Sequence, residues 1–451
     1  MAVAVGLSEK NRLCFSDCVL FLIWQLSWID KLGYMCYLKN NITYLIILII
    51  QMGIQNMMMV FAFIMAILII ARGIWPLRMP CWSRCTLMIA AAIFCLKFQI
   101  IRLLGGPMFF APDLPGWFIL IMTWGYAVMF MGFFPLAAVS AGEGIYAGYC
   151  RLQKKSLPEK YSLWLSRSRL AILMAAVAAG SWGMLNGLAD PQIKSLTLEY
   201  PDLPPAAEKL RLAVVADLHV DAVTRAAKVQ RIVDKVNAAH PDLILILGDV
   251  ADGTVKQRGT DVRPLAQLQA RYGIYAVTGN HEYFSGAAQW VDYLRNLNIK
   301  VLLNEHVKLL DGLFVAGITD PAARRFPETA EPDLPLALRN IPENASTILL
   351  AHRPGTAVQA AGYKQVILQL SGHTHGGMIA GIDRIVGLFN ENFIAGLYRI
   401  NNMDLYVSSG TSIWNGFPIR LGHNSEITLI TLQRKRSGHS GSVSGGDAAA
   451  Q

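Results

Sequence analysis

Cysteine is absent from the second half of this 451-residue sequence, because all seven cysteines precede residue 151. That half therefore has no disulfide framework and no thiolate ligand for a metal. Charged residues are also scarce: they make up 16% of the chain, whereas a soluble domain averages roughly a quarter. Since 53% of the residues are hydrophobic, this composition indicates that part of the chain lies outside water.

Histidine is missing from the first 218 residues, and all nine histidines follow them. The chain is thus divided into an apolar half and a half that carries the chemistry. No cleavable signal peptide precedes the apolar half, so we expect it to be retained. Residues 1–56 are an uncertain N-terminal segment that includes an apolar run, Tyr44–Ile54. They are either a genuine extra segment or an over-extended start, because Met52, Met57, Met58 and Met59 are alternative initiators.

Residues 57–188 contain the segments that predict a membrane region of about four helices. A bilayer is crossed by about 20 apolar residues, and three stretches satisfy this length: Met57–Pro76, Trp117–Ala141 and Leu170–Leu188. A weaker candidate, Thr86–Leu104, carries Lys97 inside it. If this segment spans, its lysine must snorkel or face a partner; otherwise the helix lies at the interface. We favour the span because it gives an even topology.

The distribution of Lys and Arg predicts how these helices are oriented. Between Cys150 and Leu170, a single acidic residue accompanies six basic ones: Arg151, Lys154, Lys155, Lys160, Arg167 and Arg169. The stretch Gly105–Gly116 contains only Asp113. The basic loops should be cytoplasmic, so the last helix delivers the second half to the extracytoplasmic side. We therefore expect a multi-pass integral protein of the inner membrane, whose net charge of +9 reflects the membrane and not a nucleic-acid partner.

From Asp190 onward the composition is that of an ordinary globular domain. Residues 189–210 are expected to form a linker and a first strand, residues 211–433 a domain, and residues 434–451 a disordered tail rich in Ser, Gly and Ala. Strand patterns alternate with helical ones, of which Val223–Ala239 and Ala287–Leu297 are the clearest. This alternation predicts an α/β domain.

Five short motifs carry the chemistry of this domain, and each directly follows an apolar run that is typical of a buried strand. The motifs are Asp217-Leu218-His219, Gly248-Asp249, Gly279-Asn280-His281-Glu282, Ala351-His352-Arg353-Pro354 and Gly372-His373-Thr374-His375. The runs are Leu212–Ala216, Leu243–Leu247, Ile274–Thr278, Thr347–Leu350 and Val366–Leu370. Open α/β sheets place their sites at the carboxyl ends of parallel strands, so we expect the five motifs to meet.

Each motif is a weaker signal alone than in the set. Asp-x-His and Gly-Asp after a strand are common in turns and helix caps. His373 and His375 place two imidazoles two residues apart between glycines. An ordinary surface loop has no reason to hold that arrangement. Carboxylate, imidazole and amide oxygen together favour Mn, Fe or Zn over Mg or Ca. A pair of such ions roughly 3.5–4 Å apart clamps a phosphate and activates a bridging water.

The order and spacing of the motifs resemble the calcineurin-like metallophosphoesterase superfamily, over about Leu212 to Leu432. The match is closer to a membrane-anchored branch of phosphodiesterases and pyrophosphatases, which also shares the turn Ser409-Gly410-Thr411. The resemblance implies an α/β fold of four layers, in which helices flank two mixed sheets. It also implies a binuclear centre of two divalent metal ions and hydrolysis by a metal-bound hydroxide.

The resemblance assigns roles position by position. One metal would be held by Asp217, His219 and His375, the other by Asn280, His352 and His373, with Asp249 between them. The remaining histidine of the motifs, His281, would protonate the leaving group or steady the transition state. The substrate would be a phosphorylated small molecule, nucleotide-type or lipid-linked; no protein partner is deducible.

Other residues admit two interpretations. Asp252 would orient a ligand or lie in a solvated turn, Glu282 would cap a helix, and Arg353 would contact phosphate or stay exposed. Trp414, Phe417 and Arg420 would line a pocket or simply pack. The alternatives to an enzyme are a non-catalytic metal-binding scaffold, which predicts lost ligands, and a sensor or transporter. The latter predicts polar residues that face one another in the membrane, for which only Lys97 and Gln99 are available.

Overall fold

The computed structural model describes residues 54–106, 111–156, 158–326 and 328–435. The predicted N-terminal segment up to residue 53, with most of its apolar run, and the predicted tail from residue 436 lie outside the described residues. The chain divides into two compact units, residues 1–182 and 183–451.

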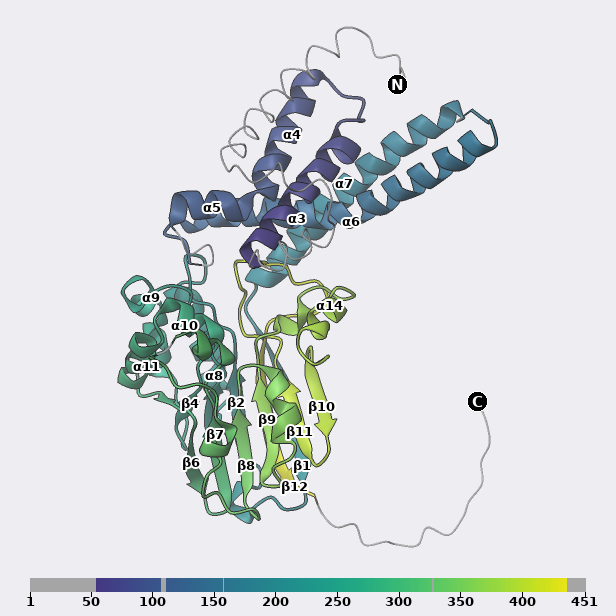
Figure 1. The fold of residues 1–451 in the computed structure, drawn as a ribbon. Helices are drawn as coiled ribbons and strands as arrows, with labels where there is room; N and C mark the ends of the chain where they lie inside the picture. Colours follow the sequence, from purple (N-terminus) through teal and green to yellow (C-terminus); the bar gives the residue numbers. More distant parts are fainter. Residues whose placement is uncertain (1–53, 107–110, 157, 327, 436–451) are drawn as a thin grey trace, which may run out of the picture. The chain divides into compact units, whose positions relative to one another are not determined.

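The described part of the first unit is helical (Figure 1). Its helices are α3 (Ile54–Leu68), continued by a π-helical turn, η3 (Ile69–Ile74), then α4 (Cys81–Cys95), α5 (Lys97–Gly105), α6 (Gly116–Leu152) and α7 (Glu159–Leu188). By length and composition, α6 and α7 can cross a membrane. They contain the predicted segments Trp117–Ala141 and Leu170–Leu188. The first predicted span corresponds to a shorter apolar helix, Met59–Ile74.

The segment Thr86–Leu104 is not one straight helix, because α4 and α5 are bent by 67°. A pair bent in this way is a broken span or a re-entrant loop, so the count of four spans stays a prediction. Lys97 begins α5 and is only 1% exposed. Its ammonium group lies 4.8 Å from the ring centroid of Phe98 and 5.6 Å from that of Tyr126. The lysine therefore faces aromatic partners, which stabilise a desolvated cation.

A second polar cluster of the first unit was not predicted. Arg72 and Arg169 both donate to Glu143 Oε2, at 2.9 Å and 2.7 Å. The three residues come from η3, α6 and α7, and Glu143 lies just beyond the predicted span Trp117–Ala141. Since each residue belongs to a different helix, the sequence pattern of any one helix contains no sign of the cluster.

The second unit contains two six-stranded mixed sheets. In the first sheet the order is β1 (Gln192–Tyr200), β12 (Glu426–Arg434), β2 (Arg211–Val215), β3 (Leu243–Ile246), β4 (Ile274–Ala276) and β5 (Lys300–Val301). In the second it is β10 (Gly396–Ile400), β11 (Met403–Val407), β9 (Val366–Ser371), β8 (Ser346–Leu350), β7 (Leu313–Gly317) and β6 (Glu305–Leu310). The five apolar runs are thus confirmed as β2, β3, β4, β8 and β9, and β2, β3 and β4 are mutually parallel, as are β8 and β9.

Helices cover the outer face of each sheet, which gives the four layers expected for the fold. The helices of this unit are α8 (Ala226–Ala238), α9 (Val255–Val262), α10 (Asn280–Ser285), α11 (Ala287–Asn296), α12 (Leu334–Ala337), α13 (Ala357–Ala360) and α14 (Asp383–Leu388). Of these, α8, α9 and α11 pack on the first sheet, and α12 and α13 pack on the second. Short 3-10 turns join them: η4 (Pro205–Ala207), η5 (Arg263–Gln267), η6 (Pro321–Arg325), η7 (Pro354–Thr356) and η8 (His375–Gly377).

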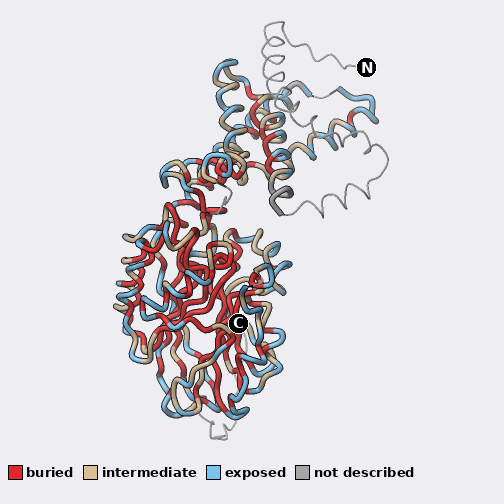
Figure 2. Tube along the Cα trace, turned by 60° about the vertical axis from the view of Figure 1, so that its left-hand side comes forward, coloured by how far each residue is buried: buried red, intermediate tan, exposed pale blue. Residues whose placement is uncertain are grey.

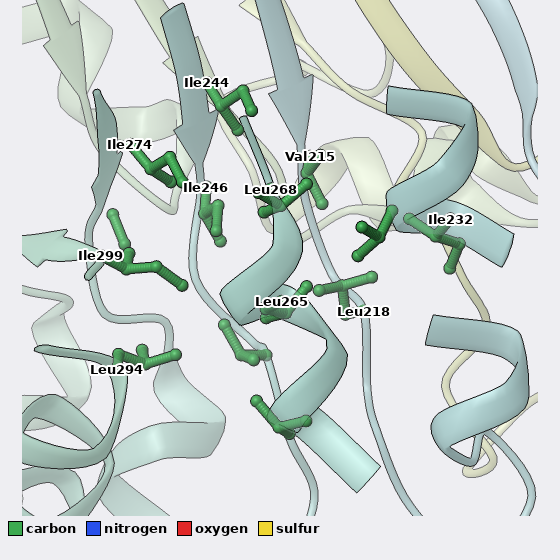
Figure 3. Close-up of a cluster of buried hydrophobic side chains, with 14 of the residues drawn as sticks. Val215, Leu218, Ile232, Ile244, Ile246, Leu265, Leu268, Ile274, Leu294 and Ile299 are labelled. Atoms are coloured by element: carbon green, nitrogen blue, oxygen red, sulfur yellow. The ribbon is translucent and has the colours of Figure 1, made fainter. Parts of the chain in front are cut away.

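Alternation along the strands explains the layering. On β2, Leu212 and Val214 point into the core between the sheets, whereas Ala213 and Val215 pack under the helices of the first sheet. The latter cluster includes Ile232 of α8 (Figure 3). A third cluster lies between the second sheet and α12 and α13. The central strands of this unit, such as β2, β3 and β8, are consequently buried, whereas the outer strands β1, β6 and β10 are partly exposed. Figure 2 shows the buried interior of this unit in red.

Truncation of Ile232, which is 1% exposed, should test this packing. Ile232→Ala should lower the free energy of unfolding by about 2–5 kcal/mol, because it removes buried surface and leaves a cavity. The measurement is urea unfolding of the full chain in detergent. Val358→Ala on α13 is the control: Val358 is 62% exposed, and its truncation should cost no more than about 0.5 kcal/mol.

Candidate metal centre

All five motifs lie where strands end, and the strands come from both sheets. Asp217 and His219 follow β2, Asp249 follows β3, and Asn280 and His281 open α10 after β4. From the second sheet, His352 follows β8, and His373 and His375 follow β9. The structure therefore brings together every residue that the sequence singled out as a metal ligand.

The backbone bends sharply at five of the seven predicted ligands. Their φ angles are positive: 53° at Asp217, 43° at His219, 51° at Asp249, 71° at His373 and 50° at His375. Each costs of order 1–3 kcal/mol outside glycine and persists only where the surrounding structure over-determines it. The cost is concentrated at the residues whose side chains must converge.

Two glycines of the motifs permit the loops to approach one another. A Cβ on Gly279 would lie 2.2 Å from Asp249 Oδ1, and one on Gly372 would lie 2.6 Å from Asp217 Oδ2. Both distances are far below van der Waals contact, so any side chain at these positions would displace a carboxylate. Gly279 therefore lets the loop after β4 approach Asp249, and Gly372 lets the loop after β9 approach Asp217.

Three groups of ligand atoms result among the described residues, each with its members within 4.8 Å of one another. Asp217, His219 and His375 form the first, Asp249, His352 and His373 form the second, and His219, Asp252 and His281 form the third. In the first group, His219 Nε2 lies 3.0 Å from His375 Nε2. In the second, His352 Nε2 lies 3.3 Å from Asp249 Oδ2, 3.2 Å from His373 Nδ1 and 3.3 Å from Asn280 Oδ1.

The protonation pattern of these imidazoles fits ligation of a cation. His352 Nδ1 lies 2.7 Å from the carbonyl oxygen of Leu247, and a carbonyl only accepts, so Nδ1 carries the proton and Nε2 faces the centre. His219 likewise donates from Nδ1 to Asp252 at 3.2 Å. Burial, and the neighbouring charges of His352 and His219 respectively, hold the pKa values of His373 and His375 well below the usual range. His373 and His375 are therefore kept neutral, and the neutral imidazole is the form that binds a divalent metal.

Asp252 is completely buried and orients two histidines, which decides between its two interpretations. Besides His219, it accepts a hydrogen bond from His281 Nδ1 at 2.5 Å. Although burial raises the pKa of Asp252, His281 and His219 lower it to about 2. Conversely, burial lowers the pKa of His281, but Asp252 and Asp249 raise it to about 9. The rings of Trp414 and Phe284 lie 6.0 Å and 6.2 Å from that of His281, so Trp414 does face the site.

Glu282 does more than cap α10. Its carboxylate accepts from three backbone amides: Gly279 at 2.7 Å, Asp249 at 2.9 Å and Val250 at 2.7 Å. Glu282 is 1% exposed, so these bonds are shielded from water. The side chain joins the loop after β3 to the loop after β4 and sets the position of Asp249.

Two further assignments are settled by contacts outside the motifs. Arg353 forms an ion pair with the buried carboxylate of Asp320, from Nε to Oδ2 at 2.8 Å, so it is held beside His352 and is not a free loop arginine. Asp320 was missed, although it follows the strand β7 as the motif residues follow theirs. Arg420 is buried and donates to the carbonyl oxygens of His375 and Ser412, at 3.3 Å and 2.7 Å. It therefore packs behind His375 and holds the backbone of that residue in place.

The sequence signature of the calcineurin-like phosphoesterase family matches residues 210–377. A metallophosphoesterase of Helicobacter pylori (strain J99) is 33% identical over 268 residues, which cover 59% of this chain and 70% of that protein. A metallophosphoesterase of Aquifex aeolicus is 30% identical over 245 residues, covering 54% of this chain and 92% of that protein. The chain belongs to the metallophosphoesterase family.

A relative that is named as a membrane protein is also similar to this chain. A zebrafish protein named as a transmembrane protein with a metallophosphoesterase domain is 35% identical over 276 residues. The match covers 59% of this metallophosphoesterase and 62% of that protein. Among solved structures, a 5'-nucleotidase precursor of Thermus thermophilus has a TM-score of 0.31 at 18% identity, covering 49% of this chain and 54% of that one.

The three hydrogen bonds of Glu282 predict the effect of removing its side chain. Glu282→Ala would leave three buried amide donors without an acceptor, each at a cost of about 1–3 kcal/mol, and would release Asp249. We expect affinity for Mn²⁺ to fall about 10–100-fold, as for other groups that orient metal ligands. Isothermal titration of the full chain in detergent measures it, and Glu343→Ala, an exposed glutamate, should leave it unchanged. Equal affinity in both variants would contradict the role given to Glu282.

Proposed function

We propose that this metallophosphoesterase is a membrane-anchored, two-metal phosphohydrolase that cleaves a phosphodiester or pyrophosphate bond. The observation that carries the proposal is the pair of ligand groups around Asp249. Oδ2 of this aspartate lies 3.3 Å from His352 Nε2 of one group and 3.7 Å from His219 Nε2 of the other. A carboxylate between two ligand groups offsets the mutual repulsion of two cations.

The ligand assignment follows from these groups. Asp217, His219 and His375 would hold one ion, Asn280, His352 and His373 would hold the other, and Asp249 would be shared. The mixed nitrogen and oxygen donors favour Mn, Fe or Zn. Two such ions, when bound, supply Lewis acidity toward the phosphate and lower the pKa of an attacking water.

His281 is the proton donor in this proposal. The carboxylates of Asp252 and Asp249 favour its charged form, and a charged imidazole gives its proton to the oxygen that leaves phosphorus. Because Asp252 binds Nδ1 of His281, the opposite nitrogen, Nε2, is directed toward the centre, 4.0 Å from Asp249 Oδ2. Asp252 is thus a positioning residue that fixes which nitrogen delivers the proton.

The anchor is the apolar first unit, and we retain residues 57–188 as the membrane region and residues 211–433 as the catalytic domain. Two described helices are long and apolar enough to cross a membrane, and the zebrafish relative is named a transmembrane protein. The basic residues between Cys150 and Leu170 support a cytoplasmic loop there, with the catalytic domain on the opposite side of an inner membrane. A phosphorylated substrate that is lipid-linked suits an enzyme held at this surface.

Substitution of the shared aspartate and of the proton donor should separate their roles. With Mn²⁺, the full chain in detergent should hydrolyse bis(p-nitrophenyl) phosphate, and a chelator should abolish the activity. Asp249→Ala should abolish it too, because both ligand groups lose their common carboxylate. His281→Ala should keep both ions and slow the reaction by about 10²–10⁴, the usual contribution of a general acid.

The control for these variants is His240→Ala, an exposed histidine outside the motifs, which should retain full activity. The matching monoester, p-nitrophenyl phosphate, tests the preference for diesters. A chain that binds Mn²⁺ and hydrolyses neither compound would favour the scaffold interpretation.

Labelling with a membrane-impermeant maleimide should test the orientation. In intact cells, Val358→Cys on the catalytic domain should react from outside, because Val358 is exposed and the wild-type domain has no cysteine. Lys155→Cys, an exposed position in the basic loop, should react only after the membrane is permeabilised. The reverse pattern would place the catalytic domain in the cytoplasm.

A further inference from the structure

One face of α14, together with Phe389 directly after the helix, exposes three large apolar side chains, and we call this the apolar face of α14. Ile385, Leu388 and Phe389 are 53%, 74% and 82% exposed. Their spacing of three and four residues places them on the same side of the helix. Ile193 and Val358 are also exposed, but singly and on other elements. Single exposed apolar side chains are common on protein surfaces, whereas a contiguous exposed apolar face marks a site of interaction.

The opposite side of α14 packs against a segment that is hydrogen-bonded to the last metal motif. On the opposite side of the helix, Gly387 is buried, and a Cβ there would lie 3.2 Å from Ile394. The carbonyl oxygen of Ile394 accepts a hydrogen bond from Thr374 Oγ1 at 2.5 Å. Thr374 lies between His373 and His375, so the segment that presents the apolar face also braces two predicted ligands.

Contacts within the second unit connect α14 to the end of the last predicted span. The final residues of α7, 183–188, belong to this unit. The backbone amide of Arg420 donates to the Gly183 carbonyl at 2.9 Å, and Asn186 Nδ2 donates to the Arg420 carbonyl at 3.3 Å. The next residue, Leu421, exchanges backbone hydrogen bonds with Met378 and Ala380, at 2.9 Å and 2.8 Å.

These contacts place the segment that leads into α14 beside the end of α7. Ala380 is three residues before α14, which begins at Asp383. If Leu170–Leu188 crosses the bilayer, its last turn lies at the surface, and the segments that hydrogen-bond to it lie there as well. Leu185 of that turn is 64% exposed, as expected of a residue in contact with lipid.

We propose that the apolar face of α14 inserts into the leaflet at which Leu188 emerges, and that the substrate is a membrane amphiphile whose phosphate reaches the centre from that leaflet. This inference rests on the proposed phosphohydrolase function. Arg384 is exposed on the same short helix, and a guanidinium beside an apolar face matches phosphate headgroups above acyl chains. That complementarity favours lipid over a second copy of the chain.

Two chromogenic diesters test the substrate side with the same leaving group. The full chain is reconstituted with Mn²⁺ in vesicles of phosphatidylcholine and phosphatidylglycerol. One diester, bis(p-nitrophenyl) phosphate, is soluble, and the other, p-nitrophenyl hexadecyl phosphate, is held in the bilayer. The double substitution Leu388→Ser and Phe389→Ser should reduce hydrolysis of the bilayer diester at least about tenfold, since each lost apolar side chain weakens insertion by about that factor.

The same variant should hydrolyse the soluble diester as fast as the unsubstituted chain, which shows that it is folded and metal-loaded. Val358→Ser, which removes an apolar residue that is 62% exposed on another helix, should affect neither substrate. Unchanged hydrolysis of the bilayer diester by the double variant would overturn the proposal, as would an equal loss in Val358→Ser.

Insertion itself is measured without any activity. A fluorophore on Phe389→Cys should be quenched by brominated lipids in these vesicles, whereas one on Val358→Cys should not, each compared with the labelled unsubstituted chain and its native cysteines. Absence of quenching at Phe389→Cys would overturn the proposal, and disulfide-linked dimers of that variant would indicate that a second copy covers the face. If the chain hydrolyses neither diester, the proposed function fails, while the quenching still decides whether α14 inserts.

Discussion

One carboxylate oxygen, Oδ2 of Asp249, determines how the rest of the catalytic unit must be built. It lies 3.3 Å from His352 Nε2, 3.7 Å from His219 Nε2 and 4.0 Å from His281 Nε2. These imidazoles come from loops after β8, β2 and β4, and therefore from both sheets. Asp249 is 2% exposed, and an isolated buried carboxylate is costly. Although burial acts in the opposite direction, the histidines hold the pKa of Asp249 well below its usual range, so the charge is kept by the convergence of the loops.

That convergence conflicts with relaxed backbone geometry, and the surrounding contacts resolve the conflict. Five ligand residues have positive φ, which no β-branched or bulky residue adopts without strain. Glu282 binds the backbone of two loops, and the carboxylate of Asp217 accepts from the backbone amide of His373 at 3.0 Å. Each loop is thus held by the side chain of another loop. Since the strands beneath are buried between helix layers, the strain cannot relax by movement of the sheets.

The sequence predicted which polar residues converge because their signal is local. A polar pair directly after an apolar run, such as Asp217 and His219 after Leu212–Ala216, reports both the strand and its end. The two mixed sheets came from the resemblance, and their pairing confirms it. Residues whose role depends on distant segments were weaker predictions. Glu282 shows its capping position in the sequence, but its bonds to Asp249 and Val250 span more than thirty positions. Asp252 could be read only as an orienting or a solvated residue for the same reason.

In the apolar half too, features with a local sequence signal were predicted, and features that depend on distant segments were not. Hydropathy identified the segments now seen within α6 and α7, because a long apolar run is a local property. The bend between α4 and α5 is not marked by proline or glycine, and Leu96 at the junction is an ordinary helix former. Glu143 and its two arginines bring three helices together, which no single stretch of sequence records.

The loop after β9 has two roles: it carries two predicted metal ligands, and it leads into α14. His373 and His375 must reach the centre, and their backbone turns require glycines on both sides. The same loop continues through Met378 and Ala380, which pair with Leu421, into α14 and back to Ile394. Thr374 is hydrogen-bonded to Ile394, in the segment that follows α14, and Thr374 lies between His373 and His375. One continuous segment therefore carries two of the predicted ligands and presents the apolar face of α14, so the position of that face is defined by the same loop that directs the two imidazoles.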